Sequence, residues 1–123
     1  MDKPETRYDI ATDVMFGPAE HMDVRAIAAA VTPWWNRTLT EVNEAVVRLG
    51  VLDGDFHWHK HDEEDEFFFV LEGQLDIELE DRTVTLHPHQ GFTVPKGVMH
   101  FPHARGRVVL LMVEKASVVP TGN

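Results

Sequence analysis

Histidines occupy alternate positions between residues 57 and 61, and a glutamate follows shortly after them. His57, His59 and His61 share one face if this segment is an extended strand, because neighbouring side chains of a strand point to opposite faces. If the run 66–71 pairs antiparallel with that strand, Glu66 lies beside the imidazoles. Imidazole nitrogens and a carboxylate oxygen together favour one divalent transition metal, and iron, zinc, manganese, nickel and cobalt are all compatible.

A fourth histidine, His100, follows a predicted strand at 92–94 and a predicted turn at 95–97. A metal site of this kind needs either such a fourth protein ligand or open positions for water. With His100 included, the candidate ligands fall into two short motifs. In the first motif, one residue separates His59 from His61, four separate His61 from Glu66, and six separate Glu66 from Gly73. In the second motif, one residue separates Pro95 from Gly97, and two separate Gly97 from His100.

These two motifs, in this order, resemble the two motifs of the cupins, and the resemblance covers about residues 34–119. It implies a small double-sheet jelly-roll barrel, also called a double-stranded β-helix. It also implies that one metal is bound inside this barrel by His59, His61, Glu66 and His100. Cupins are commonly homodimers, so the resemblance further predicts a homodimer.

The motifs depart from the cupin pattern at their opening glycines. The first of these glycine positions falls on Asp53, with Gly54 one place late, and the second falls on His89, with Gly91 two places late. Because those glycines serve turns, the departures concern the local turn geometry rather than the ligands.

Two residues near the ligands have more than one interpretation. His57 lies about 6 to 7 Å along the strand from His59 and is a candidate fifth ligand, general base or rim residue. If the chemistry is proton transfer, His57 is predicted to be the acid or base, since histidine titrates near neutral pH. Asp65 competes with Glu66 as a ligand, because slippage by one residue reverses the face, but the spacing to Gly73 favours Glu66.

The remaining pattern predicts an all-β fold with one short N-terminal helix. About nine short strands at 8 to 12 residue spacing, separated by turn residues, are typical of a sandwich or barrel. An alanine-rich segment at 23–31 predicts the helix, with an apolar stripe of Val24, Ile27, Ala28 and Val31. We therefore expect an arm and helix at 1–33, of which 1–21 is irregular, a barrel at 34–119, and a peripheral tail at 120–123.

Composition limits the compartment and the partners. The formal net charge is −10, which disfavours nucleic acid and anionic membrane surfaces. There is no cysteine, so disulfides and thiolate ligands are excluded. No apolar run approaches 18 residues, and the first 13 residues lack the apolar segment of a secretory signal, so we expect a cytoplasmic protein.

The sequence thus predicts a small metal-dependent enzyme that acts on a small organic molecule. The resemblance implies dioxygenase, isomerase, epimerase or lyase chemistry and does not choose among them, because one fold hosts many functions. The alternatives are a non-catalytic module that binds a metal and a small-molecule ligand, and a domain that the metal only stabilises.

Overall fold

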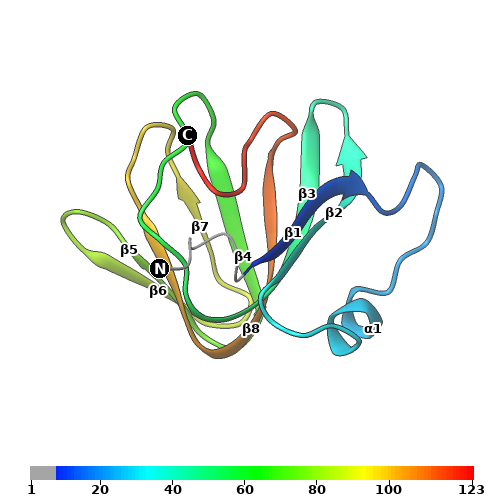
Figure 1. The fold of residues 1–123 in the computed structure, drawn as a ribbon, viewed down its shortest axis with the longest axis horizontal. Helices are drawn as coiled ribbons and strands as arrows, with labels where there is room; N and C mark the ends of the chain where they lie inside the picture. Colours follow the sequence, from blue (N-terminus) through cyan, green and yellow to red (C-terminus); the bar gives the residue numbers. More distant parts are fainter. Residues whose placement is uncertain (1–7) are drawn as a thin grey trace.

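A computed structural model describes residues 8–123, and its elements are almost all strands (Figure 1). They are, in chain order, β1 (Asp9–Val14), α1 (Val24–Ala29), β2 (Trp35–Val42), β3 (Ala45–Asp55), β4 (Glu66–Glu72), β5 (Leu75–Glu78), β6 (Thr83–Leu86), β7 (Gly91–Val94) and β8 (Phe101–Lys115). The predicted all-β class is confirmed. Residues 1–7, which belong to the predicted arm, lie outside the described residues.

Strand β8 organises the barrel because it pairs with three other strands. Its first part, up to Ala104, pairs antiparallel with β5, and its second part, from Val109, pairs antiparallel with β4, while β3 runs along both parts. Gly106 lies between the two parts with a φ of 77°, a conformation that glycine adopts without steric cost. Strand β8 continues through this glycine as one strand.

Apolar side chains fill the space enclosed by the strands. The buried set consists of Leu52, Phe68, Val70, Leu75, Ile77, Leu86, Val94, Ala104, Val108, Leu110 and Met112. Phe68 and Val70 alternate with the half-buried Phe67 and Phe69 along β4, so the inward face predicted for this strand is confirmed.

A second apolar cluster lies on the outer face of the sheet, where α1 covers part of β2, β3 and β8 (Figure 1). Asp23 caps the helix by accepting a hydrogen bond from the Ala26 amide, 3.1 Å. Ala28 is buried, and Val24, Ile27 and Val31 pack against the same cluster, so the predicted stripe is confirmed. Within residues 8–123, no helix has the length and apolar character needed to cross a bilayer.

Three expectations about local structure are wrong. Asp9–Val14 is not part of an irregular arm but forms β1, which pairs parallel with β2. Residues 57–61 do not form a strand paired with β4, because only a single bridge, His59 to His100, occurs there and β4 pairs with β7 and β8. The tail at 120–123 is not peripheral, since it lies across one end of the barrel (Figure 1).

The two displaced motif glycines have different outcomes in the structure. Gly54, one place after Asp53, has a φ of 88° and supplies the left-handed residue at the end of β3. His89 itself has a φ of 70° at the position where the cupin pattern has glycine. A histidine tolerates this conformation better than a β-branched residue does, so the turn before β7 forms without the glycine.

Candidate metal centre

Backbone hydrogen bonds hold the histidine segment against the segment before β8. The amide of His59 donates to the carbonyl of His100 at 3.0 Å, and the amide of His100 donates back to His59 at 2.9 Å. On either side, the Phe56 amide donates to Pro102 and the Gly97 amide donates to His61. These bonds place His59, His61 and His100 next to one another although 39 residues separate the last two in sequence.

Glu66 reaches the same place from β4, the strand between β7 and β8 in the sheet. Its Cα is paired with Val94 on one side and with Glu114 on the other. Because alternate residues of β4 face inward, the carboxylate enters the barrel together with Phe68 and Val70. A regular buried strand thus fixes the direction of this ligand, whereas loops carry the histidines.

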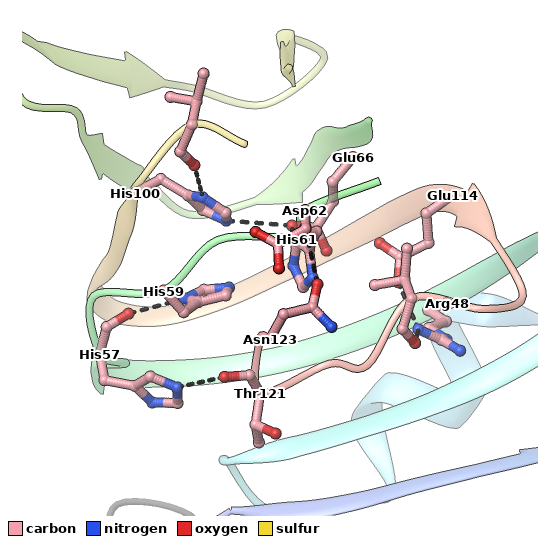
Figure 2. A network of polar contacts seen from close by, with 12 residues as sticks. Arg48, His57, His59, His61, Asp62, Glu66, His100, Glu114, Thr121 and Asn123 are labelled. Carbon is pink, nitrogen blue, oxygen red and sulfur yellow. Dashed lines mark hydrogen bonds and ion pairs between the residues drawn. The ribbon is translucent and has the colours of Figure 1, made fainter. Parts of the chain in front are cut away.

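The four predicted ligands form one buried cluster (Figure 2). One donor atom from each of them, His59, His61, Glu66 and His100, lies within 4.8 Å of every other. Oε1 of Glu66 is 3.3 Å from Nε2 of His61 and also 3.3 Å from Nε2 of His100. None of these three atoms has a hydrogen-bond partner outside the cluster among residues 8–123, and all are shielded from water. Unpaired buried polar atoms are costly, and a shared cation would satisfy them.

Hydrogen bonds to backbone carbonyls orient two of the imidazoles. Nδ1 of His59 donates to the His57 carbonyl at 2.9 Å, and Nδ1 of His100 donates to the Val98 carbonyl at 3.0 Å. Since a carbonyl only accepts, the proton of each neutral ring sits on Nδ1, which leaves the Nε2 lone pair facing the cluster. This arrangement is typical of histidines that ligate a metal.

The electrostatics of the cluster favour the protonation states that a metal needs. Burial, followed by the neighbouring His100, lowers the pKa of His59 to about 3, so this imidazole is neutral at pH 7. Burial alone raises the pKa of Glu66, but the contacts from His100 and His61 outweigh it and lower that pKa well below its usual range. Three imidazoles and one carboxylate therefore fit a divalent transition metal, with positions left open if the ion is five- or six-coordinate.

His57 lies beside the cluster but is not part of it. Its Nε2 donates to the Thr121 carbonyl at 2.8 Å (Figure 2). Its ring stacks on Phe56 with centroids 4.1 Å apart. It also lies 5.2 Å from the ring of His59, centroid to centroid. The acid or base role of His57 stays a prediction, and using Nε2 for it requires that the bond to Thr121 be broken.

The competing carboxylate, Asp65, points away from the cluster. It is exposed, and its Oδ1 accepts a hydrogen bond from the Lys96 amide at 2.9 Å. Asp65 thus stabilises the turn that leads to His100, while Glu66 is the carboxylate in the cluster.

A buried ion pair adjoins the cluster, and the sequence analysis did not single out its acidic member. Nη1 of Arg48 lies 2.5 Å from Oε2 of Glu114, and both side chains are almost fully buried. Nε of Arg48 donates to the Thr38 hydroxyl, and Nη1 also donates to the Val118 carbonyl at 3.0 Å. Burial, and then the charge of Glu66, raises the pKa of Glu114 to about 10. The available signal was a glutamate directly after the apolar run 108–113 of β8.

A narrow pocket leads to the cluster and is lined by His59, Glu66 and Glu114. Most of its other walls are apolar, formed by Trp34, Leu52, Phe56, Phe68, Pro102, Met112 and Pro120, and Asn36 adds one amide. Among the residues that the structure describes, no lysine or arginine lines it. The pocket therefore suits a largely apolar or aromatic molecule with a metal-binding end.

Comparison with known proteins assigns the chain to one family. Residues 45–114 match the family described as "Cupin domain". The Bacillus subtilis protein YdbB is 41% identical over 80 residues, which are 64% of this chain and 71% of that protein. The matched region contains all four residues of the cluster.

Solved structures agree with the fold. A cupin-2 domain protein from Shewanella frigidimarina superposes with a TM-score of 0.73 at 30% identity, over 76% of this chain and 93% of that one. Protein NMB1881 from Neisseria meningitidis superposes with a TM-score of 0.69 at 26% identity, over 78% and 99% of the two chains. The predicted jelly-roll barrel is thereby confirmed.

Proposed function

Because this chain belongs to the cupin family, we propose that it is a metal-dependent enzyme acting on a small organic molecule. The observation that carries the proposal is the convergence of four buried ligand atoms next to a mostly apolar pocket. A metal bound there would act as a Lewis acid or, if it is iron, would give access to dioxygen chemistry.

The residues of the chain have separate tasks in this proposal. His59, His61, Glu66 and His100 hold the metal, and the carbonyls of His57 and Val98 orient two of the rings. Phe68, Phe56 and Trp34 bind the apolar part of the substrate and exclude water. The chemistry that this arrangement supports is dioxygenation, isomerisation, epimerisation or lyase cleavage.

The experiment that tests this proposal starts from metal analysis of the protein purified without chelator. Metal-free protein is then loaded separately with Fe²⁺, Mn²⁺, Co²⁺, Ni²⁺ and Zn²⁺, and each form is screened for oxygen consumption and for conversion of small aromatic and apolar substrates. Conversion by at least one form, absent in the His100→Ala variant, is the expected result. Saturable binding of a molecule that is not converted over long incubation would favour the non-catalytic module instead.

The role of His57 is tested in the same assay. His57→Ala is expected to keep the metal and to lose turnover if this ring transfers a proton. Loss of the metal from that variant would instead make His57 a ligand, and unchanged turnover would remove it from the reaction.

The proposal includes the homodimer and the cytoplasmic location predicted from the sequence. In support of a dimer, Val113 is 38% exposed on β8 next to the half-buried Phe67 on the outer face of the sheet. Sedimentation of the parent protein and of Val113→Lys tests the dimer, because a buried lysine at an interface would dissociate it. A parent protein that sediments as a monomer would contradict it.

A further inference from the structure

Residues 118–123, which we call the strap, follow β8 and lie at the end of the barrel where the cluster is (Figures 1 and 2), and Pro120 of the strap lines the pocket. The base of the strap is firmly held. Val118 is 2% exposed, its amide donates to the Lys115 carbonyl, and its own carbonyl accepts the buried bond from Arg48. Because that bond comes from a charged and buried donor, it is among the stronger contacts of the strap.

The tip of the strap is held by contacts that are closer to solvent. The Thr121 carbonyl accepts from His57, the Asn123 amide donates to the Lys60 carbonyl at 2.9 Å, and Oδ1 of Asn123 accepts from the Asp62 amide at 2.8 Å. Hydrogen bonds at an exposed position contribute little net stability, so the tip can be released without unfolding the barrel.

Between base and tip, two residues of the strap touch the metal centre. Pro120 lines the pocket together with His59 and Glu66. Gly122 packs so closely on His59 that an added Cβ would lie 2.6 Å from the Cβ of His59. Gly122 also has a φ of 97°, so a side chain there is disfavoured on two grounds.

With the strap in this position, little enclosed space remains in the pocket. The pocket leaves about 30 Å³ of room for the centres of water molecules, whereas a single water needs about 10 to 15 Å³ by this measure. Two or three waters, or a ligand of similar size, fit beside the cluster. A larger group can enter only if part of the wall moves, and Pro120 is the wall residue that the strap contributes.

We propose that the strap is the specificity-determining wall of the metal centre. In the position seen here it admits only ligands of a few atoms, and an aromatic or apolar substrate binds only after residues 120–123 are displaced while Arg48 keeps Val118 in place. This inference rests on the proposed function in one respect, that the cluster holds a metal which the substrate approaches.

The experiment locks the strap with an engineered disulfide, for which the absence of native cysteines is an advantage. Asp62→Cys and Asn123→Cys are introduced together, and the protein is loaded with Co²⁺, whose visible absorption reports ligand exchange. Azide serves as the small probe and 4-phenylimidazole as the aromatic probe. The oxidised form is expected to bind azide as the reduced form does but to bind 4-phenylimidazole at least tenfold more slowly.

A second variant opens the strap and does not depend on disulfide formation. Gly122→Ala should push the tip from His59 and speed 4-phenylimidazole binding at least threefold relative to the parent. Gly54→Ala is the matched control, because Gly54 also has a positive φ, 88°, but its Cβ would meet nothing within 4 Å.

The outcomes separate the two proposals. The strap proposal would be overturned, with the metal site left intact, if the oxidised and reduced forms bind 4-phenylimidazole at the same rate. If the disulfide does not form, equal binding rates in Gly122→Ala and Gly54→Ala would overturn it in the same way. Failure of the parent protein to bind Co²⁺ would overturn the proposed function, and the role of the strap with it.

Discussion

Glu114 on β8 is paired directly with Glu66 on β4, and both carboxyl groups are buried in the same barrel interior. Two adjacent carboxylates cannot both be ionised cheaply away from water. Glu66 faces His61 and His100 and is ionised, while Glu114 faces Arg48 and, because burial and the charge of Glu66 raise its pKa to about 10, stays protonated at neutral pH. Glu66 of the cluster is therefore linked through Glu114 to Arg48, and through Arg48 to the base of the strap.

Removing one ligand should abolish metal binding while leaving the fold in place. His100→Ala is expected to lower the metal content at least tenfold, because the site loses one of its four donors. This donor is carried by the residue whose backbone is bridged to His59. Elemental analysis after equilibration with one equivalent of metal measures this, and circular dichroism checks the fold. His87→Ala, at an exposed histidine, is the control and should keep the parent's metal content. Equal metal in both variants would refute the site.

Removing Arg48 should destabilise the protein strongly. Arg48→Met leaves the Glu114 carboxyl and the Val118 carbonyl buried without their hydrogen-bond donor, and each buried group left unpaired typically costs about 1 to 3 kcal/mol. Urea unfolding measures the loss. Lys60→Met, which removes an exposed ion pair with Asp62, should cost at most about 1 kcal/mol.

The double variant Arg48→Met/Glu114→Leu distinguishes the effect of an unpaired Glu114 carboxyl from the loss of the other Arg48 contacts. It should recover most of the stability lost in Arg48→Met, because no buried carboxyl remains without a partner. A double variant as unstable as the single one would mean that the guanidinium acts through its contacts with Thr38 and Val118.

Alkaline pH should weaken the metal-free protein through Glu114. Its pKa in the folded state is raised to about 10 by burial and by the charge of Glu66, from an ordinary value of 4.5. Between pH 4.5 and 10, the folded state thus keeps a proton on Glu114 that the unfolded state releases. The contribution of Glu114 to the free energy of unfolding is therefore complete below pH 4.5 and is lost as the pH rises towards 10. Glu114→Gln keeps a neutral side chain at every pH.

Urea unfolding at pH 6 and pH 9 checks this sign. The parent protein should lose about 1 to 3 kcal/mol more than Glu114→Gln between these two pH values. Glu44→Gln, at an exposed carboxylate, should follow the parent. If the parent and Glu114→Gln lose the same stability, Glu114 is ionised in the folded protein.

Acid should weaken the metal-free protein through His59. Its pKa is lowered from 6.5 to about 3, chiefly by burial and then by His100, so the unfolded state binds a proton that the folded state does not. Stability should therefore fall as pH decreases from 6.5 towards 3, by up to about 1.4 kcal/mol per pH unit for this group. Urea midpoints at pH 7, 5.5 and 4 measure the trend, which His59→Asn should reduce and His87→Asn should not.

Metal should delay this acid destabilisation, because it binds only the neutral imidazoles of the folded state. Metal-loaded protein is expected to keep its pH 7 unfolding midpoint to a lower pH than metal-free protein does. Coincident acid profiles with and without metal would show that the ion does not bind at His59.

Much of the fold and the four residues of the buried cluster could be predicted from the sequence because the relevant patterns are local. Alternating apolar residues defined the inward face of β4, and helical spacing defined the stripe on α1. The spacing to Gly73 selected Glu66 over Asp65, and Gly73 indeed has a φ of 85° at the turn before β5.

Other features depend on which distant segments lie side by side, and local periodicity does not encode that. The partner of residues 57–61 is the segment before β8 rather than β4, so the histidines converge through a bridge and not through a hairpin. Arg48 and Glu114 become an ion pair only because β3 and β8 share a register across 66 residues of sequence. By itself, the sequence determined the ligand types, their spacing and the strand faces. Tertiary structure decided the neighbours of those ligands and the position of the strap over the pocket, because burial and strand pairing are properties of the whole barrel.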